Sequence, residues 1–171
     1  AVRLLRDAQL SGVGADDTTY NASITACGNC SEWAQALHLL ASMPADGVPP
    51  TVVTHSAAIA ACASASRWAE AVRVFDDLAA NPGLEPDVVA FFSVINASRL
   101  GRSWEGALAY FWQLRHRAVE PDAGIFRAVI TSLMEAGQYK MASGVYKEAL
   151  RRGVLVDEGR DALRDSPSRE K

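Results

Sequence analysis

Short amphipathic segments and helix-breaking residues alternate along the chain. In residues 33–41 the apolar positions follow the i, i+3, i+4, i+7 spacing that lines one face of an α-helix: Trp33, Ala36, Leu37, Leu40 and Ala41. Residues 20–27 show the same spacing. Proline and glycine follow such segments, as at Gly47, Gly83 and Gly153, where they end a helix. This pattern predicts many short helices joined by turns.

The whole pattern repeats every 35 or 36 residues. Tryptophan occurs at Trp33, Trp68 and Trp104, and Tyr139 follows 35 residues later. Three more columns keep these steps: Tyr20, His55, Phe91 and Phe126; Ala36, Ala71, Ala107 and Ala142; Leu40, Phe75, Phe111 and Tyr146. Four columns in register indicate a structural repeat of two helices. Because one helix pair cannot bury both of its faces alone, the units must stack into an α-solenoid.

The repeat divides the chain into units. Four full units are expected at residues 17–51, 52–87, 88–122 and 123–157, and the fourth is divergent. Residues 1–16 are expected to be the second helix of an incomplete repeat, and residues 158–171 the start of a further helix with a polar tail. Because the chain starts in such a helix without Met, we expect it to be part of a longer or processed protein.

Composition and charge narrow the possible partners. Of the 171 residues 49% are apolar and 22% charged, which suits a continuous core. No run approaches the roughly 18 apolar residues of a membrane helix, so no direct membrane insertion is predicted. The net charge of −3 divides into −3 for residues 1–66, −2 for 67–137 and +2 for 138–171. A nucleic-acid-binding protein usually carries a clustered basic face, and only the last third of the chain is basic.

A C-x-x-C sequence, Cys27-Gly28-Asn29-Cys30, suggests a zinc or redox site. Zinc takes about four Cys or His ligands, and the chain has no second C-x-x-C and no H-x3–5-H. Redox pairs belong to a βαβ context, which the helical pattern lacks. Both cysteines fall in columns of small residues: Cys27 aligns with Cys62 and Ser98, and Cys30 with Ala65, Gly101 and Ala136. We interpret the motif as structural packing in a reducing compartment.

No arrangement of residues indicates catalysis. The sequence shows no Ser/His/Asp or Cys/His constellation and no glycine-rich phosphate loop. His55 takes an aromatic position in its column, so core packing is expected for it. We predict a protein that is not an enzyme, with no catalytic residue, no cofactor, no metal ion and no small-molecule substrate.

The wording of the units resembles the pentatricopeptide repeat family across residues 17–157 and the flanking fragments. The units open with "TTYNASITAC", "VTHSAAIAAC" and "VAFFSVINAS", continue with "WAQALHLL", "WAEAVRVF" and "WEGALAYF", and close with "GLEPD" or "VEPD". The 34-residue tetratricopeptide signature W-x2-L-G-x2-Y is absent. The resemblance implies a right-handed α-solenoid that binds single-stranded RNA, about one base per unit, in a plastid or mitochondrion. There it would serve RNA processing, stability or translation.

The resemblance also implies which residues contact RNA. The residue after the opening aromatic and the last residue of the unit recognise the base edge, and the second residue wedges between bases. Units one to four thus offer Asn21 with Thr51, Ser56 with Asp87, Phe92 with Asp122, and Arg127 with Asp157. The wedge positions are Thr18, Val53, Val89 and Gly124, and glycine provides no wedge. By the family's pattern Ser56 with Asp87 takes guanine and Asn21 favours a pyrimidine. Phe92 could stack, and Arg99 or Arg127 could contact phosphate.

A second function competes with RNA binding. Stacking contributes roughly 1–3 kcal/mol per base, so two competent units bind no better than about the millimolar to tens-of-micromolar range. A degenerate array can instead be a structural or protein–protein scaffold subunit of a larger organellar complex. Exposed aromatics such as Phe92 and Trp112 would then anchor the partner. A basic groove would favour RNA, and an apolar groove would favour a protein partner.

Overall fold

Eight helices and no strands make up the part of the chain that the computed structural model describes, residues 16–155. The helices are α2 (Asp17–Asn29), α3 (Trp33–Ser42), α4 (Val52–Ser64), α5 (Trp68–Ala80), α6 (Val88–Leu100), α7 (Trp104–His116), α8 (Ala123–Glu135) and α9 (Tyr139–Arg151). They form an all-α helical repeat solenoid, which confirms the predicted fold class. Apart from Asp16, the elements expected in residues 1–16 and 158–171 lie outside the described residues, as does Asp157.

The same cap begins every first helix of a pair. Each first helix is preceded by a residue whose side-chain oxygen accepts the backbone N–H three residues later: Asp16, Thr51, Asp87 and Asp122, at 2.8, 3.4, 2.8 and 2.8 Å. An N-terminal turn leaves its first N–H groups without helical partners, and such caps satisfy one of them. The caps recur at the repeat spacing and fix where each first helix starts.

A second recurring turn joins the two helices of each pair. One residue past the C-cap of each first helix the backbone has positive φ, at Ser31, Ser66, Arg102 and Gly137, with φ of 59°, 57°, 57° and 73°. This left-handed residue reverses the chain and is a common way for a helix to end. The C-caps themselves are Cys30, Ala65, Gly101 and Ala136, the small-residue column of the sequence.

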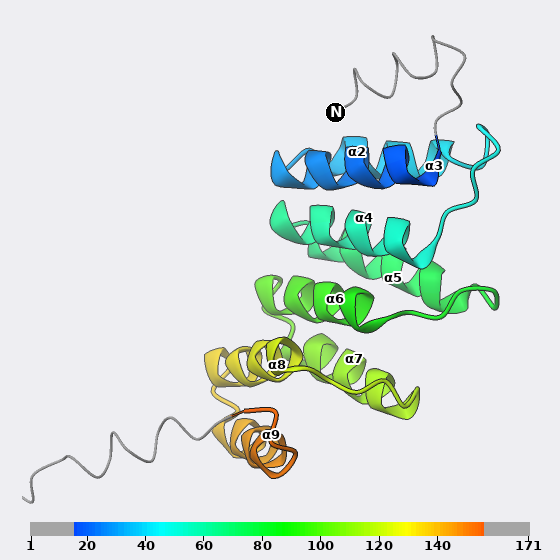
Figure 1. Cartoon of the computed structure of the whole chain (residues 1–171). Coiled ribbons are helices and arrows are strands. Elements are labelled where there is room, and N and C mark those ends of the chain that lie inside the picture. Colours follow the sequence, from blue (N-terminus) through cyan, green and yellow to red (C-terminus); the bar gives the residue numbers. More distant parts are fainter. Residues whose placement is uncertain (1–15, 156–171) are drawn as a thin grey trace, which may run out of the picture.

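The helices form two layers. The first helices α2, α4, α6 and α8 stack in order along the molecule and each packs on the next (Figure 1); we call them the inner layer. The second helices α3, α5, α7 and α9 form the outer layer. Among the described residues, no Cα atoms of successive outer helices lie within 8 Å of each other. Because the inner helices are the closer packed, the stack curves with the inner layer on its concave side.

Aromatic side chains pack together where successive helix pairs meet. Phe75 of α5 packs edge-on against Phe91 of α6 with ring centroids 5.0 Å apart, and Phe111 of α7 meets Phe126 of α8 at 5.4 Å. All four rings are fully buried, as is Tyr20. His55, in the same column as Tyr20, differs from the predicted core role: it is half-buried, and its Nδ1 lies 2.8 Å from the Thr51 carbonyl oxygen. A polar ring in this column keeps its nitrogen near the helix end.

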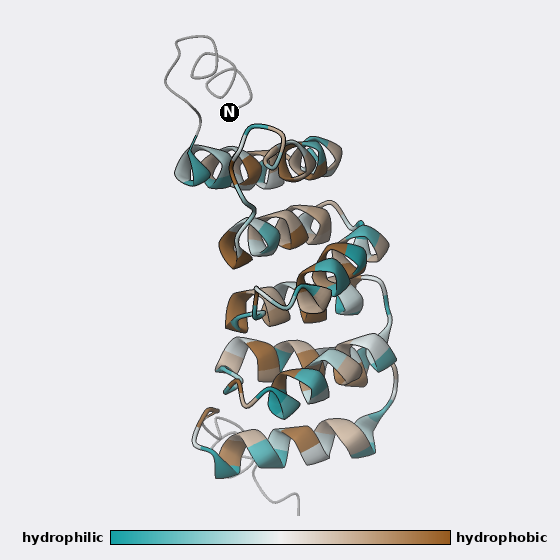
Figure 2. Cartoon of the chain, turned by 90° about the vertical axis from the view of Figure 1, so that its right-hand side faces the viewer, coloured by the Kyte–Doolittle hydropathy of each residue, from teal (hydrophilic) through white to brown (hydrophobic). Residues whose placement is uncertain are grey.

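Each helix carries both hydrophobic and hydrophilic residues (Figure 2), as the amphipathic pattern predicts. The apolar sides meet between the layers, where 31 hydrophobic residues form one continuous core through the described units. Among residues 16–155 no helix combines the length and apolar character needed to span a bilayer.

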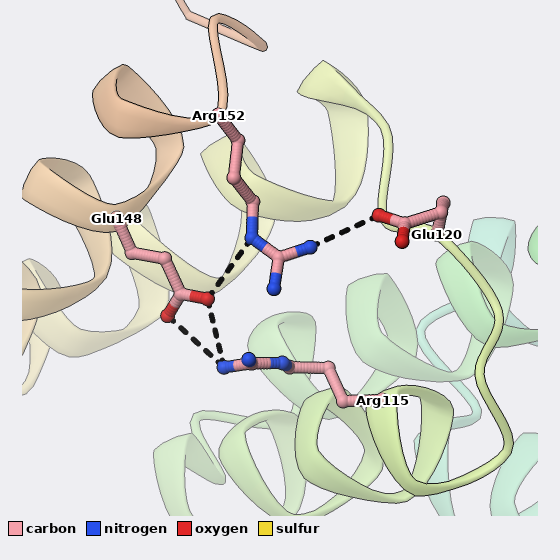
Figure 3. Close-up of polar contacts among 4 residues, drawn as sticks. All are labelled: Arg115, Glu120, Glu148 and Arg152. Atoms are coloured by element: carbon pink, nitrogen blue, oxygen red, sulfur yellow. Dashed lines mark hydrogen bonds and ion pairs between the residues drawn. The ribbon is translucent and has the colours of Figure 1, made fainter.

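Ion pairs tie the last two outer helices together. Arg115 of α7 lies 2.8 Å from a carboxylate oxygen of Glu148 on α9, across the gap between the two helices (Figure 3). Arg152, just past α9, lies 3.1 Å from Glu148 and 2.9 Å from Glu120. The Glu148 side chain is 23% exposed and that of Glu120 is 85% exposed. Glu148 is therefore the shared and better-buried acceptor of this cluster.

Replacing Glu148 should weaken the joint between these helices. Glu148→Gln leaves Arg115 without a carboxylate and Arg152 with Glu120 alone, and we expect the free energy of unfolding to fall by about 1 kcal/mol. The loss should shrink in about 1 M salt, which screens partly exposed charges. Urea unfolding followed by circular dichroism measures it. Glu120→Gln, at the exposed edge, is the matched control and should change stability by less than about 0.3 kcal/mol; equal losses for both variants would contradict the assignment.

Candidate nucleic-acid interface

The side of the inner layer that faces away from the outer helices, here called the open side, presents the wedge residues that the sequence analysis predicted. Val53 and Val89, the wedge residues of units two and three, are each 58% exposed, and Thr18 is exposed too. They are the second residues of α4, α6 and α2, two positions after the N-caps. The recurring cap therefore presents one wedge position per unit at the same place on each inner helix.

Unit two brings its two base-recognition candidates together. The Ser56 hydroxyl donates to Asp87 Oδ1 at 3.4 Å, across 31 residues of chain. The same Asp87 oxygen accepts the Ala90 N–H at 2.8 Å and so caps α6. Ser56 is 4% exposed and Asp87 is half-buried. A hydroxyl and a carboxylate thus share one position between α4 and α6.

Unit one has a different arrangement. Thr51 and Thr54 form a reciprocal capping box, with their hydroxyl oxygens 2.9 Å apart. The side-chain oxygen of Asn21 is buried and has no hydrogen-bond partner among the described residues. A buried acceptor without a partner is costly. Asn21 therefore retains an unused acceptor in α2, beside α4.

Units three and four depart from unit two. Phe92 is 39% exposed, and its ring lies against Gly124 of the next unit. Asp122 is exposed and caps α8 through the Ile125 N–H at 2.8 Å. Arg127 is exposed on α8. The sequence analysis did not predict the contact between Phe92 and Gly124, because the two residues belong to different columns of the repeat.

Few charges line the inner helices. The four inner helices hold two acidic and two basic residues, Asp17, Arg99, Arg127 and Glu135, and α4 has no charged residue. Arg99 is partly neutralised: its guanidinium lies 3.1 Å from Asn96 Oδ1 and 3.5 Å from Glu135. The charges within the four helices therefore cancel, but the N-caps Asp16, Asp87 and Asp122 add three carboxylates at the helix starts, so the inner layer is neither a basic groove nor a purely apolar one.

An open cleft not foreseen from the sequence lies between the C-terminal ends of α6 and α8. Its volume is about 540 Å³, and its lining is polar and apolar in similar measure: Arg99, Leu100, Arg102, Ser132, Glu135 and Ala136. Arg99 and Glu135 are separated by 36 residues, one repeat length. That spacing between opposite charges was the signal that could have indicated the contact.

The aromatic anchors proposed for a protein partner do not form one patch. Phe92 belongs to the inner helix α6, whereas Trp112 belongs to the outer helix α7. Trp112 packs edge-on against Phe111, with ring centroids 5.5 Å apart, and lies under the Arg115 guanidinium at 5.1 Å. Trp112 is 44% exposed, on the outer layer and not on the inner one.

The C-x-x-C cysteines differ in environment. Cys27 and Cys62 are buried, whereas Cys30, the C-cap of α2, is exposed. Burial raises the pKa of the Cys62 thiol to about 11 and also raises that of Cys27. Reactive and metal-binding cysteines need the thiolate, which a lowered pKa favours. The packing interpretation holds for Cys27, but the Cys30 side chain takes no part in the core.

Comparisons with known proteins agree with the repeat. The model described as PPR repeat family matches residues 15–64, and the model described as PPR repeat matches residues 53–81 and 125–154. These matches together cover more than half of the chain.

Two relatives from Arabidopsis thaliana are pentatricopeptide repeat-containing proteins designated chloroplastic. At3g09650 is 27% identical over 135 residues, which are 79% of this chain and 17% of the relative. At1g30610 is 28% identical over 68 residues, 40% and 7% respectively. The chain thus spans less than a fifth of either relative.

Solved structures share the fold. The PPR domain of Arabidopsis thaliana protein-only RNase P 1, in complex with tRNA, superposes with a TM-score of 0.78 at 15% identity, covering 95% of this chain and 86% of that domain. PPR10 in complex with an 18-nt psaJ RNA element gives 0.77 at 18% identity, covering 90% of this chain and 22% of PPR10. PPR10 from maize gives 0.71 at 25% identity, covering 92% of this chain and 22% of PPR10.

Thiol labelling of the folded protein tests the assignment of the cysteines. At pH 8 we expect Cys30 to react with N-ethylmaleimide within minutes, while Cys27 and Cys62 react only after denaturation. With a pKa of about 11, roughly one Cys62 thiol in a thousand is ionised at that pH. Mass spectrometry of the labelled peptides measures this, and Cys30→Ser is the control that should remove the fast reaction. A Cys27–Cys30 disulfide that formed in mild oxidant would contradict a purely structural motif.

Proposed function

Because the chain belongs to the pentatricopeptide repeat family, we propose that it binds single-stranded RNA along the open side of its inner layer. Each competent unit takes about one base, held between the wedge residues of successive units. Sequence-specific recognition of RNA targets such unpaired bases, since a duplex hides them in its narrow groove.

We base this proposal on one observation, the Ser56–Asp87 pair. A carboxylate only accepts hydrogen bonds, and a hydroxyl can donate or accept. The Watson–Crick edge of guanine presents N–H donors beside a carbonyl oxygen. Asp87 can accept from the donors while Ser56, 3.4 Å away, turns its hydrogen toward the carbonyl oxygen. Val53 and Val89, exposed one unit apart, offer apolar surfaces to the two faces of that base.

We extend the proposal to an organelle. Both relatives from Arabidopsis thaliana are designated chloroplastic, which favours a plastid over a mitochondrion. There the protein would act in RNA processing, stability or translation. The likeness to protein-only RNase P 1 concerns the fold of its PPR domain. We therefore propose a binding role without catalysis. The two related structures in complex with RNA support RNA as the partner.

The lack of a basic groove along the inner layer favours one alternative, a scaffold for protein subunits of a larger organellar complex. Helix α4 has no charged residue, and exposed apolar residues such as Val53 and Val89 suit a protein partner as well as a base. Ultraviolet crosslinking of the full-length protein in its own cells separates the two functions. RNA attached to residues 18–24 or 53–60 supports base recognition, and protein crosslinks on the same segments without RNA support the scaffold.

A change of one atom at Asp87 should switch the preferred base. Asparagine caps helices as well as aspartate does, so Asp87→Asn keeps the start of α6. Its amide both donates and accepts, which complements adenine instead of guanine. In octamer RNAs of uridine with one central purine, we expect the wild type to prefer guanosine and the variant adenosine, each by about tenfold. Fluorescence anisotropy at protein concentrations up to about millimolar measures both.

Two companion variants keep this test specific. Ser56→Ala should weaken binding only at the same nucleotide, because it removes the hydroxyl of that pair. Ser103→Asn changes the cap of the outer helix α7, where the hydroxyl accepts the Gly106 N–H, and should leave base preference unchanged. A uniform loss of affinity for every octamer in Asp87→Asn would mean that Asp87 acts through the helix cap alone.

Salt should affect RNA binding only weakly. At most two inner-layer cations, Arg99 and Arg127, can contact phosphates, and Arg99 is shared with Glu135. For single strands each contact changes the slope of log K against log salt by about −0.7, so we expect a slope no steeper than about −1.4. Anisotropy titrations between about 50 and 200 mM salt measure it. A slope near −4 would show that RNA follows a basic surface elsewhere on the molecule.

A further inference from the structure

Phe92 and Gly124 fit together across the joint between units three and four. A Cβ atom added to Gly124 would lie 3.3 Å from Cε2 of the Phe92 ring and 3.5 Å from its Cδ2. Contacts near 3.3 Å are already tight, and the Cγ atoms of a valine would reach further into the ring. The Phe92 ring thus occupies the place that a wedge side chain on α8 would fill.

The four units make this pairing specific. At the wedge positions the chain has Thr18, Val53, Val89 and Gly124, and at the first base-recognition positions Asn21, Ser56, Phe92 and Arg127. Among the described units, the only wedge position with glycine is that of unit four, which directly follows the unit with phenylalanine at its base-recognition position. The other three wedge positions have a side chain. Phe91, the preceding residue, is fully buried, whereas Phe92 is 39% exposed. Phe92 therefore presents a ring to solvent and is not needed to fill the core.

Building on the proposed function, we propose that Phe92, seated on Gly124, replaces the missing wedge of unit four and binds an RNA base by its face. The ring has no hydrogen-bonding atom, so it cannot complement Asp122 as Ser56 complements Asp87. Stacking depends on the area of the base and tolerates any sequence. Unit three therefore prefers purines to pyrimidines and distinguishes poorly between adenine and guanine, beside a guanine-selective unit two.

The carboxylate of Asp122 favours a base over an apolar protein side chain at this place. Asp122 Oδ1 lies 3.2 Å from the same added Cβ position on Gly124, so the carboxylate and the ring both flank this position. An apolar anchor would remove water from this exposed carboxylate and supply no donor, which is costly. A base stacked on Phe92 brings its own N–H groups and can replace that water.

A fluorescent base tests the stacking directly. The probes are octamers of uridine with one guanosine and with 2-aminopurine on its 5′ or 3′ side, because the emission of 2-aminopurine changes when it stacks on an aromatic ring. With the whole 171-residue chain we expect this change for one of the two probes. Phe92→Leu keeps an apolar side chain but should abolish the change, and Phe92→Ala should weaken binding roughly 5- to 150-fold.

Two further variants control for folding and for position. Trp112→Leu removes an aromatic of similar exposure from the outer helix α7 and should leave emission and affinity unchanged. Phe92→Asn with Gly124→Val restores an amide and a wedge. It should lose the emission change and gain discrimination of at least about fivefold among the four bases at this nucleotide. Circular dichroism verifies that each variant is folded.

The outcomes separate this inference from the proposed function. If Phe92→Leu retained the guanosine preference and showed the same change of 2-aminopurine emission as the wild type, the stacking on Phe92 would be wrong and the proposed function would stand. No binding of any octamer by the wild type at about millimolar concentration would overturn both. If Phe92→Leu weakened capture of a protein partner and left RNA binding intact, the ring would belong to a protein interface and the inference would be wrong.

Discussion

The structure depends on one constraint: a single helix pair of this length cannot bury both of its apolar faces. The contacts that satisfy it join an outer helix to the next inner helix, as Phe75 joins Phe91 and Phe111 joins Phe126. Because these contacts bring every inner helix against its neighbour, the inner layer is close-packed and the outer layer is splayed. Curvature, and the side of the molecule on which one position per unit lies open, follow from this packing.

The residue that ends each unit also starts the next inner helix, and this double role limits what it can be. Good N-caps are Asp, Asn, Ser and Thr, which are also short side chains that can hydrogen-bond a base edge. Thr51 and Asp87 are examples, one in a capping box and the other shared between a cap and Ser56. A repeat of this kind can therefore change the chemistry of its open side by exchanging one cap for another without losing the helix.

Periodic features of the structure could be predicted from the sequence, and contacts between unlike positions could not. The alanine column is buried in every unit, and a small residue ends every first helix, so these two features follow from spacing alone. The tryptophan column recurs too, but Trp68 and Tyr139 are 44% and 68% exposed. His55 breaks its column chemically and remains half-buried at the helix end. The Phe92–Gly124 contact and the Arg115–Glu148 ion pair join different columns 32 and 33 residues apart. Such distances depend on how far each unit rotates against the next, which composition and periodicity do not specify.

Because the inner layer has no basic groove, it can bind a partner mainly through short-range contacts. Charge attraction acts at long range and on any sequence, whereas stacking and edge hydrogen bonds act only at contact and differ from base to base. Helix α4 has no charged residue, so in the proposed function unit two binds a base through Val53, Ser56 and the carboxylate of Asp87. Its contribution to affinity is small but depends on the identity of the base. A longer array would add such contributions unit by unit. The proposed function is therefore specific binding of low affinity, in which contact with the base, and not charge, selects the partner.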